Sequence, residues 1–185
     1  MTRFPVEEYA SLELNQVAFP KTGMVVSQTP LGNSFTKEAP CENGMWVVAD
    51  KAAGAINPPA AVTDKPLGIV YTSEKEYDAM HYGLKTFGRK IAGDYPRVGI
   101  FGLGDTVTTN CLQYDESTYA TFEALETALK TAAAGGAEMY VIPTAGSGVP
   151  TLSASKGSAT TYGKVVKYYT VPNGEKGVKY QIVSL

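Results

Sequence analysis

The side chains that most often act as nucleophiles, bases or metal ligands are few in this chain, and they are widely separated in the sequence. The chain has 185 residues, with one histidine, His81, and two cysteines, Cys41 and Cys111. A metal site needs several ligands close together, and nucleophilic catalysis needs a base beside the nucleophile. No segment of the sequence supplies either set. We therefore expect no catalytic residue, no metal site and no bound cofactor.

The glycines of residues 99–104 come nearest to a nucleotide-binding motif. Their spacing differs from the dinucleotide fingerprint, and a Thr-rich segment follows them in place of a helix. They are better explained as turn glycines, with Asp105 bonding local backbone N–H groups. An enzyme assembled from scattered residues such as His81, Asp105 and Tyr162 remains the weakest of the alternatives.

The composition predicts a β-rich globular chain that works through broad contacts. Its 44% hydrophobic content can fill a core, whereas only 18% of the residues are charged. Thr, Ser, Gly and Tyr take the place of the missing charge. Burying a Tyr or Thr costs less desolvation than burying a Lys or Glu, so this surface suits binding to other proteins. A plain β-rich domain would have the same composition, because Thr and Tyr favour strands.

Charge and hydropathy argue against nucleic acid and membrane partners. The net charge is −2 and arginine occurs only three times. The best basic cluster is spread over two expected strands: Lys164, Lys167, Lys176 and Lys179. No apolar run approaches the ~20 residues that span a bilayer. The first residues lack the hydrophobic region of a secretory signal, so we expect synthesis in the cytoplasm and favour free thiols over a disulfide.

Short extended segments between turn residues predict a mainly β fold with one or two helices, arranged as a β-sandwich or a barrel-like domain. Two hairpins are expected, one where 97–101 and 105–112 flank a Gly-x-Gly turn and one where 165–171 and 178–185 flank residues 172–177. Further strands are expected at 24–27, 44–49, 67–72 and 139–143.

The clearest helix is expected at 121–134. Phe122, Leu125 and Leu129 recur on one face, Thr121 can cap the first turn, and Gly135 follows the last turn. Two other segments allow two interpretations each. Residues 73–95 fit a short helix or a long surface loop, and residues 144–163 fit a flexible loop or a weak strand pair.

Residues 1–22 contain large apolar side chains at irregular spacing. The segment either packs on its own domain or forms an extended arm that docks on a neighbouring subunit. We expect the arm, which divides the chain into an N-terminal arm, 1–22, and a single β-rich domain, 23–185. The apolar arm residues are then the candidates for partner contacts: Phe4, Tyr9, Leu12, Leu14 and Phe19.

Three stretches resemble the decoration proteins of tailed-phage heads. They are GMWVVADKAAGAINPPAAVTDKPLGIVYT (44–72), VGIFGLGDTVTTN (98–110) and VVKYYTVPNGEKGVKYQIVSL (165–185). The helix at 121–134 and the N-terminal arm are not part of the simplest version of that fold.

The resemblance implies a homotrimer that binds the major capsid protein on the outer surface of a capsid and staples neighbouring capsomers. Such a chain would be made in the host cytoplasm and end in the virion, with no nucleic acid or membrane partner. Binding only the assembled shell stabilises that shell by mass action, and many weak sites gain avidity. The alternative is a head-fibre, tail or surface-adhesion β-module without enzymatic activity.

Overall fold

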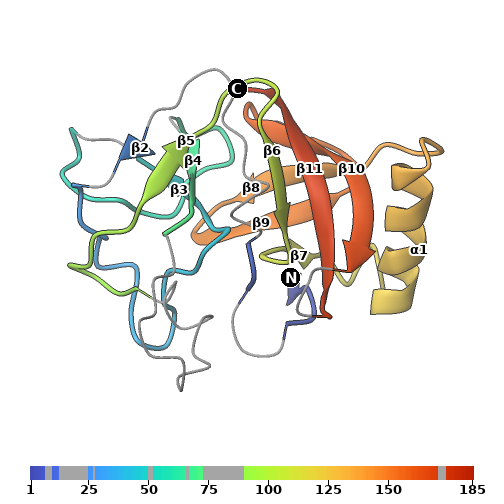
Figure 1. Ribbon diagram of the computed structural model, residues 1–185, viewed down its shortest axis with the longest axis horizontal. Coiled ribbons are helices and arrows are strands. Elements are labelled where there is room, and N and C mark those ends of the chain that lie inside the picture. The colour runs from blue at the N-terminus through green and yellow to red at the C-terminus, as the bar shows by residue number, and fades with distance from the viewer. Residues whose placement is uncertain are drawn as a thin grey trace.

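The computed structural model shows a mainly β protein, and the residues that it describes form two sheets and one helix (Figure 1). It describes residues 1–6, 10–12, 25–26, 28–49, 52–65, 67–72, 90–170 and 174–185. Within these ranges the elements are β1 (Thr2–Arg3), β2 (Val25–Val26), β3 (Trp46–Val48), β4 (Leu67–Val70), β5 (Val98–Ile100), β6 (Thr106–Thr109), β7 (Gln113–Tyr114), α1 (Phe122–Ala133), β8 (Tyr140–Thr144), β9 (Ser147–Ser153), β10 (Tyr162–Thr170) and β11 (Lys176–Ser184).

The larger sheet curls until its two edges approach each other. Its strand order is β1-β7-β9-β8-β10-β11-β6, with β7 and β9 parallel and the other neighbours antiparallel. β6 and β7 lie near opposite edges, yet only residues 110–112 separate them in the chain. Because so short a link spans at most roughly 14 Å, the edges must lie close together. The larger sheet is therefore an incompletely closed barrel, in agreement with the barrel-like alternative.

The smaller sheet has the order β2-β5-β4-β3 and lies beside the larger one (Figure 1). Side chains of a strand alternate between faces. One face sends Trp46 and Ile69 into the core shared with the larger sheet. The opposite face sends Val47 and Val70 into a second core, which loop residues such as Phe35 cover.

Helix α1 packs on β10 at the side of the larger sheet away from the smaller one (Figure 1). Its Leu125, Leu129 and Ala132 are buried. The Ala124 N–H donates to the Thr121 hydroxyl over 3.3 Å, so the N-cap is the residue that the sequence predicts. The helix prediction is confirmed.

Local patterns also predict most of the strands correctly. β3, β4, β8 and the hairpin of β10 and β11 lie where they are expected. Of the two interpretations of residues 144–163, the strand interpretation is confirmed in part, because β9 occupies 147–153 and pairs with β8. Of the ambiguous segment 73–95, residues 73–89, with His81, lie outside the described residues.

The hairpin expected around the Gly-x-Gly turn is wrong. β5 belongs to the smaller sheet and β6 to the larger one, so the two strands do not pair. The turn itself is tight, with Gly104 at φ +92°. Its Gly104 N–H donates to the Ile182 carbonyl over 2.8 Å, and the Ile182 N–H donates to the Asp105 carbonyl over 2.8 Å. These bonds attach the turn to β11 of the larger sheet, at the point where the chain passes from the smaller sheet to the larger one.

Candidate functional site

The described residues of the 1–22 segment, 1–6 and 10–12, pack on their own chain. Phe4 is 1% exposed, and its ring meets that of Phe122 edge-on at 5.1 Å. In this conformation Phe4 therefore offers no surface to a partner. Leu12 is partly buried against the same core. The other predicted contact residues, Tyr9, Leu14 and Phe19, lie outside the described residues.

The N-terminal segment contacts both edges of the larger sheet. On one edge, Thr2 and Arg3 of β1 pair with β7. On the other edge, Leu12 forms a β-bridge with Thr109 at the end of β6. The N-terminal segment thus bridges the opening of the barrel. We call this region, where residues 1–6 and 10–12 meet β6 and β7, the seam.

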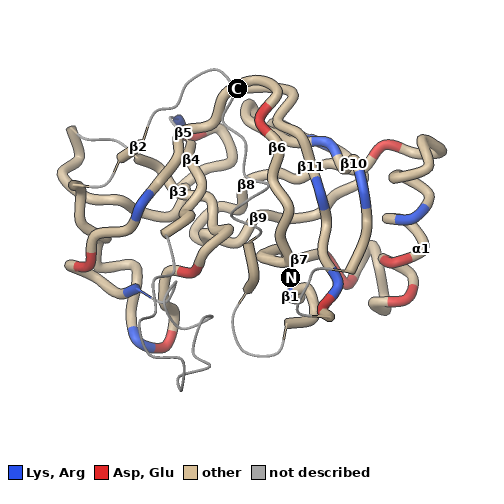
Figure 2. The backbone as a smooth tube through the Cα atoms, viewed as in Figure 1, with Lys and Arg blue, Asp and Glu red and all other residues tan. Residues whose placement is uncertain are grey.

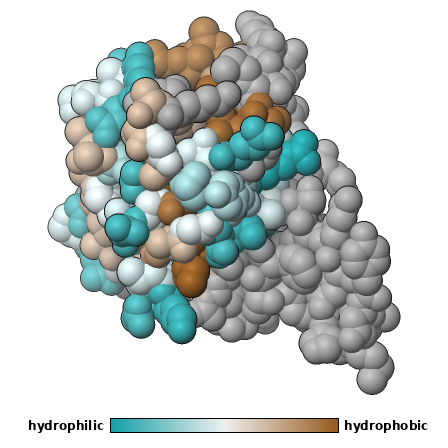
Figure 3. All heavy atoms as spheres, turned by 90° about the vertical axis from the view of Figure 1, so that its left-hand side faces the viewer, coloured by the Kyte–Doolittle hydropathy of each residue, from teal (hydrophilic) through white to brown (hydrophobic). Residues whose placement is uncertain are grey.

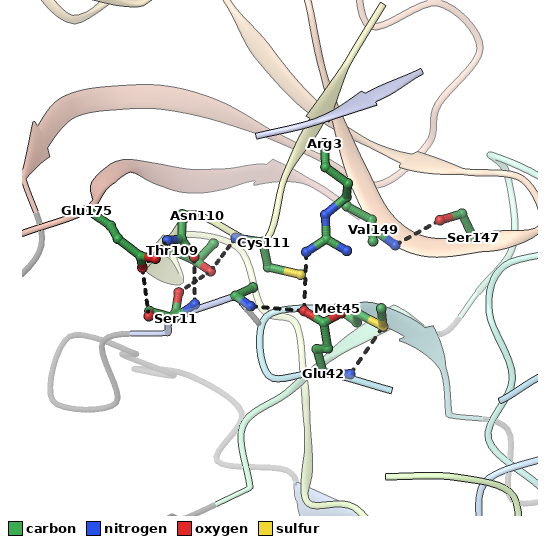
Figure 4. A network of polar contacts seen from close by, with 11 residues as sticks. Arg3, Ser11, Glu42, Met45, Thr109, Asn110, Cys111, Ser147, Val149 and Glu175 are labelled. Carbon is green, nitrogen blue, oxygen red and sulfur yellow. Dashed lines mark hydrogen bonds and ion pairs between the residues drawn. The ribbon is translucent and has the colours of Figure 1, made fainter. Parts of the chain in front are cut away.

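A network of hydrogen bonds fixes one side of the seam (Figure 4). The Ser11 N–H donates to Asn110 Oδ1 over 2.6 Å, and the Thr109 hydroxyl donates to the Ser11 carbonyl over 2.7 Å. Asn110 Nδ2 in turn donates to Glu175 Oε2 over 2.9 Å. Glu175 precedes β11, so the network also connects the closing hairpin to the seam.

Glu42 fixes the other side of the seam and is 8% exposed. Its Oε2 lies 3.2 Å from Arg3 Nη2 and accepts the Ala10 N–H over 2.9 Å (Figure 4). The Arg3 side chain is 34% exposed and that of Glu42 is 10% exposed, so water partly screens this ion pair and it stabilises less than a fully buried one. Together with the Ala10 bond, the pair holds the N-terminal segment to the loop before β3.

A pocket of about 300 Å³ opens beside this ion pair, and Arg3, Glu42, Gln113 and residues 146–149 contribute to its lining. The amide of Gln113 donates to the Val149 carbonyl over 3.0 Å and is also bonded to neighbouring hydroxyl groups. Arg3 Nη2 and Glu42 are thus bonded to each other and Gln113 is bonded to β8 and β9, whereas Arg3 Nε is buried without a hydrogen-bond partner among the described residues. This arrangement gives them a structural role in closing the barrel.

The two thiols are free and fully buried. Burial raises the pKa of Cys111 to about 12, and it raises the pKa of Cys41 still further. Both thiols are therefore protonated at neutral pH, and a protonated thiol is a poor nucleophile. The free thiols agree with the expectation from the sequence.

The other residues considered for chemistry have local roles. Asp105 is fully buried, and its Oδ2 accepts the Gly102 N–H over 2.6 Å, as the turn chemistry predicts. Burial raises the pKa of Asp105, although the Gly102 amide lowers it. Tyr162 is half-buried and meets the ring of Tyr140 edge-on at 5.6 Å.

In the part of the chain that the structure describes, no three His, Cys, Asp or Glu residues lie close enough together to hold a metal ion. Within the same residues, no helix has the length and hydropathy needed to cross a membrane. The surface on the side of the smaller sheet shows hydrophobic residues in separate spots among hydrophilic ones (Figure 3).

The outer face of the closing hairpin is a feature whose arrangement the sequence did not reveal. Lys167 of β10 and Lys179 of β11 are register partners, and Lys164 pairs in the same way with Gln181. The alternation of the two strands predicts that these residues point outward, but only the register places the lysines opposite each other.

No family model, curated protein or solved structure matches the chain. The proposals below therefore depend on the seam, on the outer face of the hairpin and on the resemblance of the three sequence stretches to phage decoration proteins.

Proposed function

We propose that the protein is a non-enzymatic virion structural protein that decorates and stabilises the outer surface of a phage capsid. The observation that carries the proposal is that the buried thiol and the Arg3–Glu42 ion pair have structural surroundings and form no reactive site. Cys111 is protonated, while Arg3 and Glu42 are paired within the seam. Arg3 and Glu42 hold the N-terminal segment to its own chain, and the exposed face of β10 and β11 is left for contact with a large partner.

The resemblance supports the same proposal. Its three stretches cover β3 with β4, β5 with β6, and the hairpin of β10 and β11. A cement protein must keep its fold while it links capsomers. The seam supports this requirement, because it ties the two edges of the barrel together. In this proposal the major capsid protein is the partner and the protein acts as a homotrimer. Exposed residues, rather than the buried Phe4, make the contacts.

The test is co-sedimentation of the full chain with shells assembled from the major capsid protein of the source phage. We expect binding to expanded shells and no binding to unexpanded ones, because the function is to staple capsomers after expansion. Light scattering of the free protein should give three times the chain mass of 19.7 kDa. A monomeric chain that binds expanded shells would refute only the trimer.

Absence of binding to any shell would contradict decoration. Antibody labelling of intact virions then separates the remaining possibilities. Label on fibres or tails would support the alternative of a head-fibre, tail or adhesion module. Virions without label would exclude every virion role.

A further inference from the structure

The outer face of the closing hairpin concentrates positive charge without neutralising it. Lys167 and Lys179 lie directly opposite each other on adjacent antiparallel strands. Basic positions stand side by side on β10 and β11 in Figure 2, on the broad front of the larger sheet. The chain as a whole carries a net charge of −2, so this face has the opposite sign to the whole molecule.

Like charges in a cross-strand pair destabilise a sheet. Among the described residues, no carboxylate forms an ion pair with Lys167 or Lys179. Lys164, one pair further along the hairpin, differs because it forms an ion pair with Glu138. The fold thus carries a repulsion at Lys167 and Lys179 that a carboxylate from outside could relieve.

The neighbours of this lysine pair are apolar and aromatic. The Lys167 ammonium lies 5.8 Å from the centre of the Tyr169 ring. Val166 is 48% exposed and Val183 is 37% exposed, although both lie in strands. Val183 follows Lys179 and Gln181 at the strand period of two and therefore shares their face. We call Val166, Lys167, Tyr169, Lys179 and Val183 the basic face.

We infer that the basic face docks on an acidic polypeptide surface, with a carboxylate seated between Lys167 and Lys179. Exposed valines suit the apolar part of a protein surface, and interfaces between proteins are enriched in Tyr. A nucleic acid fits less well, because the basic face has no arginine and only two lysines with which to bind phosphates. The inference rests on the proposed function in one respect, since it makes this face the one turned toward the capsid.

The first experiment measures binding of fluorescent poly-L-glutamate to the full chain by anisotropy at low salt. We expect the double variant Lys167→Gln with Lys179→Gln to bind about tenfold more weakly, as the loss of two partly screened charge contacts predicts. The matched control is Lys37→Gln with Lys65→Gln, which removes the same charge from exposed positions outside the basic face. The control should change affinity less than about twofold.

Thermal unfolding separates a binding role from a structural one. Because the pair is repulsive, the Lys167→Gln, Lys179→Gln variant should unfold at the same temperature as the parent or at a higher one. Equal polyglutamate binding by parent and variant would overturn the inference, and so would an equal loss in the Lys37→Gln, Lys65→Gln control. Tighter binding of single-stranded DNA than of polyglutamate through the same lysines would also overturn it.

The same variants applied to capsid shells distinguish the two proposals. If the parent binds shells and the double variant binds equally well, decoration stands and the inference about the basic face fails. If the parent binds polyglutamate but no shell, and the double variant loses polyglutamate binding, the inference about the basic face stands and decoration fails.

Discussion

Replacing Phe4 by Ala should destabilise the fold strongly. Phe4 is 1% exposed, and it lies in the main core, with its ring nearly perpendicular to that of Phe122. Truncating a buried phenylalanine costs about 3–5 kcal/mol, because transfer free energy is lost and a cavity remains. A typical domain is stable by only about 5–15 kcal/mol, so this one change removes a large share of the total.

The assay is equilibrium unfolding in urea, followed by the fluorescence of Trp46. Trp46 is the only tryptophan in the chain and is fully buried. The control is Tyr95→Ala, at a side chain that is 59% exposed, and it should change stability by less than about 0.5 kcal/mol. A loss below about 1 kcal/mol for Phe4→Ala would refute the reasoning. The N-terminal segment would then be free to act as an arm toward a neighbour.

The remaining predictions concern backbone conformation, a buried hydrogen bond and pH. Gly44→Ala should destabilise by at least about 1–3 kcal/mol more than Gly104→Ala. Both glycines have φ near +90°, but a Cβ at Gly44 would lie 2.5 Å from the Cβ of Cys111, whereas Gly104 faces open space. Equal losses in urea unfolding would contradict that close approach. Tyr180→Phe should cost about 1–3 kcal/mol and shift the Trp46 emission, because the indole N–H now donates to the Tyr180 hydroxyl over 2.8 Å. Unchanged stability and emission would argue against this bond. Burial raises the folded-state pKa of Asp105 above its usual value. Its stabilising contribution is therefore complete below the unfolded pKa and is lost as pH rises through the folded pKa. Asp105→Asn should remove this component, which is checked by comparing the urea midpoints of parent and variant from about pH 4 to pH 7. Parallel pH curves would contradict the assignment.

Local signals in the sequence explain why some elements could be predicted. The helix depends on a cap at Thr121, a repeating apolar face and a stop at Gly135, all within one short segment. The closing hairpin depends on alternation and a turn between neighbouring strands. In both cases the residues that decide the structure are close together in the chain.

Contacts between distant segments explain what the sequence did not reveal. The Gly-x-Gly turn predicts a reversal of the chain but not that its two strands join different sheets. That outcome depends on bonds to Ile182 of β11, far along the chain. The seam likewise depends on partners such as Ser11 and Asn110, which are 99 residues apart. The irregular spacing of apolar residues fits the described residues 1–6 and 10–12, which meet the two sheet edges through one short strand pairing and one β-bridge.

The arrangement of lysines on the outer face of the hairpin could not be predicted from the sequence either. The sequence places Lys167 and Lys179 on two neighbouring strands, and a solvated strand face explains them equally well at that stage. Whether they lie opposite each other depends on the pairing register, which the irregularity between Val165 and Lys167 shifts. A single extra residue in one strand thus decides whether a like-charge pair exists.

The short link between β6 and β7 has a consequence for biosynthesis. The edges that this link joins are completed by β9 and β11, which leave the ribosome after it does. β1 can pair with β7 once residues 113–114 have emerged, but β6 pairs with β11, which is made much later. At a synthesis rate of about 5–20 residues per second, the free edge of β6 stays without this partner for several seconds. The larger sheet is therefore completed late in synthesis, at the edge that β11 and β6 form.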